Sequence, residues 1–249
     1  MWNLKFFFIL MAVSLLSTGC RVDSGSQRSS SVDSQLTNRT RPAEPITETA
    51  LETQSATPQN HNDTTDTRPI IVCFGDSLTA GYGADPGQSY PDYLQSLLDS
   101  RGYHYRVVNL GVSGNTTKDG VQRLPHVLEL HPYLVVVEFG GNDGLRGVPI
   151  SDSRANLDQI IKAIQSSGAR VVIAGITLPP DYGPDYIKKF NETYILLAKK
   201  YKDPMLPFLL QNVYGVPGLM QRDNTHATAA GNKIVASNIL PLLTPLLKK

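Results

Sequence analysis

The stretch Ile70-Ile71-Val72-Cys73-Phe74-Gly75-Asp76-Ser77-Leu78 decides how the chain is organised. Its first five residues form a short apolar run, which is typical of a strand buried on both faces. The run stops at Gly75, and a serine follows two positions later. Open α/β folds bind their ligands where buried parallel strands end. Ser77 is therefore a candidate nucleophile, provided that other segments supply a base and oxyanion donors.

Segments with strand and helix patterns alternate from this stretch to the C-terminus. Apolar runs predict strands at residues 70–74, 105–109, 133–139, 171–174 and 205–209. Helical periodicity predicts helices at residues 88–100, 116–130, 151–167, 185–201 and 227–240. Residues 140–147, which include four glycines, are expected to form a loop. The alternation predicts an α/β fold, a three-layer α/β/α sandwich with a central parallel sheet of about five strands.

Composition narrows the classes of function. The 249 residues carry a net charge of +1 with acids and bases interspersed, which does not favour a nucleic-acid partner. The two cysteines lie in a leader and in an apolar strand, so no disulfide framework is predicted, and Cys73 is expected to be a buried thiol. The five histidines lack the spacing of metal ligands, and no Gly-Lys-Ser/Thr phosphate loop occurs. We therefore expect neither a metal nor a cofactor.

The first quarter of the chain does not have the pattern of a folded domain. Residues 1–20 resemble a bacterial lipoprotein signal, with Lys5, a short apolar core and small residues before Cys20. An ordinary secretory signal with an incidental cysteine is the alternative. Both interpretations predict export. The first places the domain on the periplasmic side of a bacterial membrane with a tether through lipidated Cys20, and the second predicts a secreted or soluble periplasmic protein. Residues 21–69 are polar and lack aromatic residues, which predicts a disordered linker before a domain at residues 70–249.

Four polar segments are expected to meet at the carboxyl edge of the sheet. Ser77 would be the nucleophile, His226 its general base, and Asp223, one helical turn before His226, the acceptor for the imidazole Nδ1–H. The oxyanion would be held by the backbone N–H groups of Ser77 and Gly114 and by the side-chain amide of Asn142. Each residue alone is an ordinary turn or cap residue, and the complete set is what indicates acyl transfer.

These segments, in this order, resemble those of the SGNH (GDSL) hydrolase superfamily. The similarity rests on Gly75-Asp76-Ser77-Leu78, on Val112-Ser113-Gly114 and on residues 140–147 and 178–183. The last two segments are similar to the bacterial periplasmic acyl-CoA thioesterase, lysophospholipase and arylesterase group. The resemblance implies a flavodoxin-like SGNH hydrolase fold over residues 70–247 and the same catalytic residues. It also implies a serine esterase or thioesterase that forms an acyl-enzyme on small-molecule acyl substrates without a cofactor.

Two alternatives remain open from the sequence. A carbohydrate O-acetylesterase would use the same fold, and a non-catalytic tethered binding domain would have lost the activity.

Several residues carry more specific expectations. The family usually has a glycine where Asn224 stands and a proline where Ala227 stands, and asparagine tolerates the left-handed conformation that a glycine would supply. Tyr82, Arg146 and Tyr182 are candidates for substrate binding, with a structural salt bridge as the alternative for Arg146. Asp76 is expected to brace the turn at Ser77 through backbone hydrogen bonds. Three histidines are expected to lie at the surface or to have their hydrogen bonds satisfied without a functional role: His104, His126 and His131.

Overall fold

The computed structural model describes residues 66–249. The predicted signal segment, Cys20 and residues 21–65 of the predicted linker lie outside the described residues. Within residues 66–249, no helix combines the length and the apolar character needed to cross a membrane.

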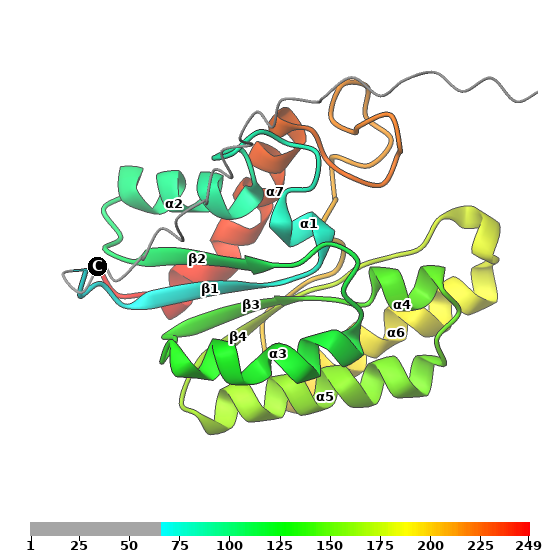
Figure 1. Cartoon of the computed structure of the whole chain (residues 1–249), viewed down its shortest axis with the longest axis horizontal. Coiled ribbons are helices and arrows are strands. Elements are labelled where there is room, and N and C mark those ends of the chain that lie inside the picture. The colour runs from blue at the N-terminus through cyan, green and yellow to red at the C-terminus, as the bar shows by residue number, and fades with distance from the viewer. Residues whose placement is uncertain (1–65) are drawn as a thin grey trace, which may run out of the picture. The chain divides into compact units, whose positions relative to one another are not determined.

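Five parallel strands form one sheet in the order β2-β1-β3-β4-β5, as Figure 1 shows. The strands are β1 (Ile70–Gly75), β2 (Arg106–Gly111), β3 (Leu134–Glu138), β4 (Arg170–Ala174) and β5 (Met205–Leu206). The chain order reverses between β1 and β3, because β2 pairs on one side of β1 and β3 on the other. Ligands bind at such a switch point in open α/β sheets.

Helices cover both faces of the sheet, which confirms the predicted three-layer sandwich. One layer contains α2 (Tyr90–Ser100) and α7 (Ala229–Leu243), and the other contains α3 (Thr117–Glu129), α5 (Ile150–Ser166) and α6 (Pro184–Tyr201) (Figure 1). The remaining short helices are α1 (Ser77–Ala80), α4 (Gly141–Leu145), η1 (Pro180–Tyr182) and η2 (Thr244–Leu246). Capping boxes at Ser89 and Thr116 begin α2 and α3, because each side chain satisfies a backbone N–H that the first helical turn leaves free.

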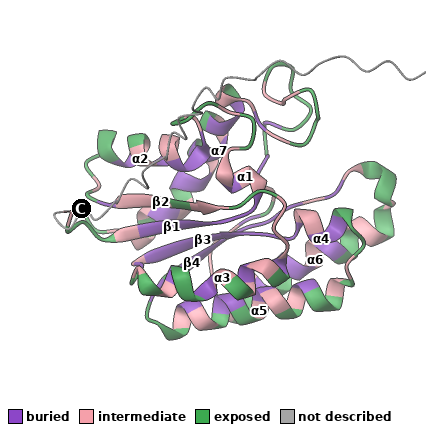
Figure 2. Cartoon of the chain, viewed as in Figure 1, coloured by how far each residue is buried: buried purple, intermediate pink, exposed green. Residues whose placement is uncertain are grey.

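The core lies between the sheet and the two helical layers, where Figure 2 shows β1, β3 and β4 buried over most of their length. Cys73 in β1 is completely buried, as predicted, and burial raises the pKa of its thiol to about 12. Strand β2 is less buried than β1 because it has a neighbour on one side only.

Three predicted elements differ from the structure. The expected loop at residues 140–147 contains the short helix α4. Gly140 adopts φ 118° before this helix, and Asp143 anchors it by accepting the backbone N–H of Thr117. The fifth strand contains only two residues, since Pro207 has no N–H to continue the ladder. The last helix begins at Ala229 rather than 227, with the side chain of Thr228 as its cap.

Candidate active site

Ser77 lies in the sharp turn between β1 and α1. Asp76 is the cap of α1, and its Oδ1 accepts the backbone N–H of Leu78 at 3.0 Å. This contact confirms the bracing role expected for Asp76. A side chain at Gly75 would collide with Thr79 and Glu138, so the residue before Asp76 must be small for α1 to pack against β3. The turn therefore holds the serine at the carboxyl edge of the sheet.

A continuous chain of hydrogen bonds joins Ser77 to His226 and Asp223. Ser77 Oγ lies 2.8 Å from His226 Nε2, and His226 Nδ1 lies 2.7 Å from Asp223 Oδ2. With an ionised Asp223 accepting the Nδ1–H, Nε2 is free to accept the serine proton, which is the arrangement a serine nucleophile requires.

The loop that carries the acid and the base is not helical, so the expected helical turn between them is wrong. Asp223 Oδ1 instead accepts the backbone N–H groups of Thr225 at 2.9 Å and of His226 at 3.0 Å, which closes a compact turn. Asn224 adopts φ 52° in this turn, the left-handed conformation expected from its side chain. Burial works to raise the pKa of Asp223, but the hydrogen bonds from the His226 side chain and from these two N–H groups outweigh it and lower the pKa.

The three expected oxyanion donors lie on the ends of three neighbouring strands. Asn142, on α4 after β3, donates its amide hydrogens to Asp76 Oδ2 at 3.1 Å and to the backbone oxygen of Asn115 at 3.0 Å. Gly114, after β2, adopts φ 80°, and the space where a side chain would project holds only the tip of Arg146. Within residues 66–249, the backbone N–H groups of Ser77 and Gly114 are not used by a protein acceptor. Both groups are therefore available to a substrate oxygen.

A buried carboxyl group that the sequence did not single out lies beneath this turn. Glu138, the last residue of β3, is fully buried, and its Oε2 accepts the backbone N–H of Asp76 at 3.2 Å and the hydroxyl of Thr79 at 2.7 Å. Burial, followed by the negative charge of Asp76, raises the pKa of Glu138 well above its ordinary value. Burial also raises the pKa of Asp76, to about 6.

Burial shifts Glu138 toward its protonated form more strongly than Asp76. Asp76 receives hydrogen bonds from Leu78 and Asn142 that favour its ionised form, whereas Oε1 of Glu138 has no hydrogen-bond partner among residues 66–249. The sequence does contain a signal for this site, because Glu138 is a charged residue inside the apolar run 133–139. Acidic residues are rarely buried unless they have a partner or a function.

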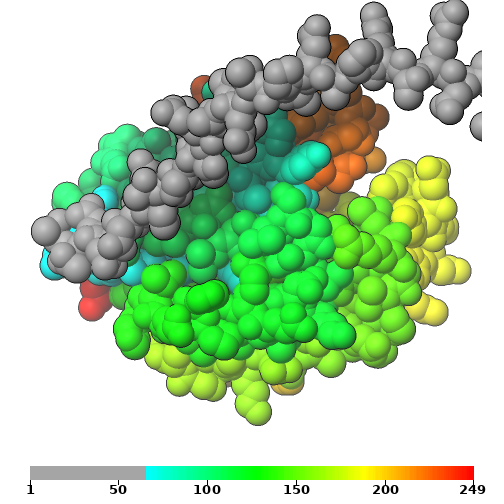
Figure 3. Space-filling view, in the orientation of Figure 1, coloured from blue at the N-terminus to red at the C-terminus, as the bar shows by residue number. Residues whose placement is uncertain are grey.

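An apolar cavity of about 230 Å³ opens beside Ser77 and His226. Figure 3 shows the surface hollowed between the loop of residues 207–228 and the green and yellow segments. The apolar side chains that line the cavity are Leu78, Leu145, Ile176, Leu178, Pro179, Phe208, Leu210 and Tyr214. Leu210 and Tyr214 were missed because their segment has no helical or strand periodicity to predict where it folds back. Phe208 was missed because it was expected in a strand at residues 205–209, which ends at Leu206 in the structure.

None of the three residues expected to bind substrate lines this cavity. Tyr82 lies with its ring against the imidazole of His226, at 4.7 Å between ring centres. Tyr182 donates its hydroxyl to the backbone oxygen of Leu145 at 3.0 Å. Arg146 reaches toward Gly114 and makes no ion pair among the described residues, which gives no support to the salt-bridge alternative. His104, His126 and His131 are exposed, as predicted, and no cluster of metal-ligating side chains occurs among residues 66–249.

A serine hydrogen-bonded to a histidine–aspartate pair, beside an apolar cavity on a three-layer α/β/α fold, is typical of an acyl hydrolase. The chain belongs to the GDSL-like Lipase/Acylhydrolase family, which it matches over residues 73–234. The protein is therefore a hydrolase of ester or thioester bonds in small molecules, and the resemblance seen in the sequence is confirmed.

Individual relatives agree with this assignment. Esterase TesA of Pseudomonas aeruginosa is 43% identical over 178 residues, which cover 71% of this chain and 89% of the relative. Thioesterase 1/protease 1/lysophospholipase L1 of Escherichia coli strain K12 is 36% identical over 177 residues, covering 71% and 84%. The crystal structure of TesA superposes with a TM-score of 0.69 at 42% identity and covers 72% of this chain and 99% of that one.

Proposed function

We propose that the protein cleaves carboxylic esters or thioesters of acyl chains through an acyl-enzyme on Ser77. The observation that carries the proposal is the unbroken hydrogen-bonded chain from Ser77 Oγ through His226 to Asp223. The apolar lining of the adjacent cavity supports an acyl chain, rather than an acetyl group alone, as the part of the substrate that is bound.

The reaction follows from the placement of these groups. His226 Nε2 takes the proton of Ser77 while Oγ attacks the carbonyl carbon, and ionised Asp223 stabilises the imidazolium that results. The backbone N–H groups of Ser77 and Gly114 stabilise the oxyanion, and the Asn142 amide contributes a third donor when its side chain rotates so that one N–H leaves its protein acceptor and faces the substrate. His226 then protonates the departing alcohol or thiol, and water, activated by the same histidine, releases the acid and restores Ser77.

The test is a panel of p-nitrophenyl esters and acyl-thioesters of increasing chain length. Wild-type protein should turn over the longer chains, and Ser77→Ala should lower kcat by at least about a thousandfold because no other group replaces the nucleophile. The matched control is Ser237→Ala, which removes an exposed hydroxyl on α7. Wild-type turnover no faster than that of Ser77→Ala would contradict the proposal. Activity confined to acetyl esters would favour an O-acetylesterase instead.

We further propose that residues 1–20 direct export, that Cys20 is lipidated and that residues 21–69 tether the domain on the periplasmic side. The support is the arrangement of Lys5, the apolar core and the small residues before Cys20. Incorporation of labelled palmitate in cells should disappear in Cys20→Ser and persist in Cys73→Ser. Equal labelling of Cys20→Ser and wild type would exclude the lipid anchor.

A further inference from the structure

The two reacting side chains of the site come from segments that are far apart in the chain. Ser77 and His226 are separated by 149 residues, yet their side chains must meet at 2.8 Å. Ser77 is fixed by a short helix at the end of a buried strand, whereas His226 lies on the long connection between β5 and α7. A misplacement of about 1 Å between reacting groups can cost about a hundredfold in rate, so the connection between the two segments matters for function.

Gln221 bonds to both segments at once. Its backbone N–H donates to the backbone oxygen of His226 at 2.8 Å. Its side-chain amide donates to the backbone oxygens of Ala227 at 2.9 Å and of Tyr82 at 2.7 Å. The residue therefore holds the main chain of the base and of the residue after it, and attaches this loop to the turn that follows the nucleophile.

The bond to Tyr82 leads directly to Ser77. The backbone N–H of Tyr82 donates to the backbone oxygen of Ser77 at 3.0 Å, and the Tyr82 ring lies against the His226 imidazole. Gly83 leaves the space that the Gln221 carboxamide occupies, since a side chain at position 83 would collide with Gln221 Oε1. The same glutamine thus reaches the main chain of Ser77 through one residue and the main chain of His226 directly.

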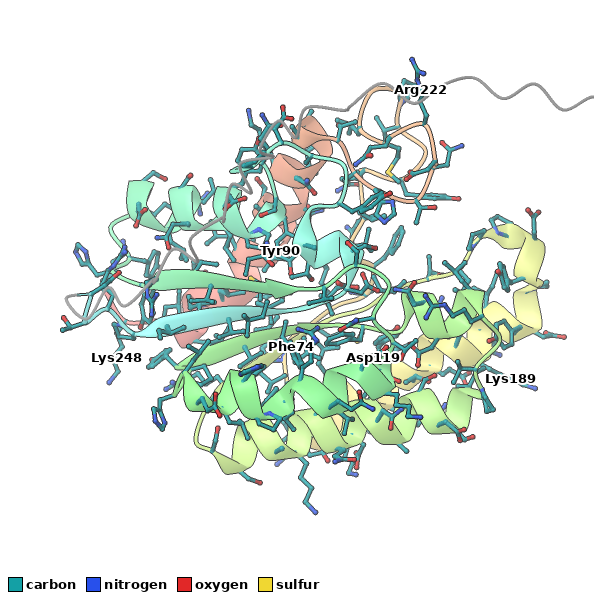
Figure 4. All side chains as sticks on the ribbon, in the orientation of Figure 1. Phe74, Tyr90, Asp119, Lys189, Arg222 and Lys248 are labelled. Atoms are coloured by element: carbon teal, nitrogen blue, oxygen red, sulfur yellow. The ribbon has the colours of Figure 1, made fainter. Side chains whose placement is uncertain are left out.

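The chemistry of these contacts requires a neutral amide. Two carbonyl oxygens face one nitrogen, and a carboxamide supplies two N–H donors, whereas a carboxylate would set a negative oxygen against both carbonyl groups. Gln221 does not line the cavity beside Ser77, so it does not contact the acyl chain there. Its neighbour Arg222 is exposed and points away from the molecule in Figure 4, so the adjacent side chain does not share this role.

We propose that Gln221 is a positioning residue that sets the distance between Ser77 and His226 by joining the turn after the nucleophile to the loop that carries the base. The inference rests on the proposed function of Ser77 and His226. It adds that Gln221, a residue outside the substrate cavity, helps to align the reacting atoms.

The test is a double-mutant cycle with His226. Gln221→Leu should lower kcat about 10- to 100-fold with little change in KM, because alignment is lost while the acyl cavity is untouched. In a His226→Ala background, the same change should lower the residual kcat less than about twofold, since there is no base left to position. Gln221→Asn should recover part of the activity, and Gln221→Glu should not. The matched control is Gln122→Leu, an exposed glutamine on α3 whose replacement should leave kcat unchanged.

The outcomes separate this inference from the proposed function. An equal loss in both backgrounds, or a Gln221→Leu enzyme that keeps wild-type kcat, would overturn the positioning role while leaving Ser77 as the nucleophile. A wild-type protein without turnover would overturn the proposed function itself. If Gln221→Leu does not fold, the rate at which a fluorophosphonate labels Ser77 in Gln221→Asn and Gln221→Glu gives the same comparison, and equal rates in these two variants would also overturn the inference.

Discussion

The nucleophile side of the site and its acid–base side are held in place in opposite ways. Around Ser77 the supporting polar groups are buried, with Asp76 and Glu138 exposed by 2% and 0%, and their bonds run to neighbouring strand ends. Around His226 the support is exposed, and Asp223 bonds mainly within its own turn. The first region is fixed by the core of the fold, whereas the second depends on a few local contacts. Activity and stability should therefore respond differently to changes in each.

The two regions also differ in the direction of their pKa shifts. Burial raises the pKa of Glu138 and of Asp76, whereas hydrogen bonds lower the pKa of Asp223. The buried carboxyls therefore weaken the folded state as pH rises, and Asp223 stabilises it at pH values above its unfolded pKa. Substitutions can separate these contributions.

The largest expected effect is the loss of activity without loss of stability in Asp223→Asn. An amide in place of the carboxylate can donate to Nδ1, which leaves the imidazole in the wrong tautomer, and kcat should fall about 10³- to 10⁴-fold. The Asp223 side chain is 41% exposed, so the melting temperature should change by only a few degrees. Steady-state kinetics and thermal unfolding of the same preparation measure both quantities. A kcat above one tenth of the wild-type value would contradict the role of Asp223.

The buried side should lose activity and stability together. Asn142→Ala removes an oxyanion donor and also the partner of Asp76, so kcat should fall about 10²- to 10³-fold and the free energy of unfolding by about 1–3 kcal/mol. Urea unfolding and single-turnover kinetics measure the two effects. Gln165→Ala is the control, because its amide donates to Asp203 at 2.8 Å just before β5, at the opposite edge of the sheet. It should cost some stability and leave kcat unchanged, and a similar kcat loss in both variants would show that the effect is not specific to the site.

The smallest expected effect is a pH dependence of stability that Glu138→Gln removes. Because the folded pKa of Glu138 lies above its ordinary value of 4.5, the folded state binds more protons than the unfolded state between these two values. The unfolding free energy of the wild type should therefore fall, relative to that of Glu138→Gln, by up to about 1.4 kcal/mol per pH unit as pH rises above 4.5. Below that pH the contribution of the buried acid is fully present.

Chemical denaturation at several pH values measures this difference. Glu129→Gln, an exposed position on α3 with a side chain 71% exposed, should show no such slope relative to wild type. A pH-independent difference between wild type and Glu138→Gln would mean that Glu138 is ionised in the folded protein.

The same contrast explains what could be predicted from the sequence. The strands around Ser77 are short apolar runs with clear ends, so their order and the residues they bring to the sheet edge follow from local patterns. The loop of residues 207–228 has no such period, and its path is decided by contacts such as that of Gln221 with Tyr82. Leu210 and Tyr214 therefore could not be assigned to the cavity, and Phe208 was placed in a predicted strand, at residues 205–209, that ends at Leu206 in the structure. Glu138 differs, because the charged residue inside an apolar run is visible in the sequence, whereas its partners come from β1 and α1 and no local pattern indicates them.

Cys73 in strand β1 and Ser77 at the start of α1 are four positions apart in sequence, and their reactive side chains report different events. The thiol of Cys73 is sealed in the centre of the sheet and should be alkylated only when the sheet opens. The hydroxyl of Ser77 stands at the sheet edge, within reach of a phosphonate while the protein stays folded. If both residues are labelled in the same sample, the rate of Cys73 alkylation reports global unfolding, and the rate of Ser77 labelling reports the integrity of the site.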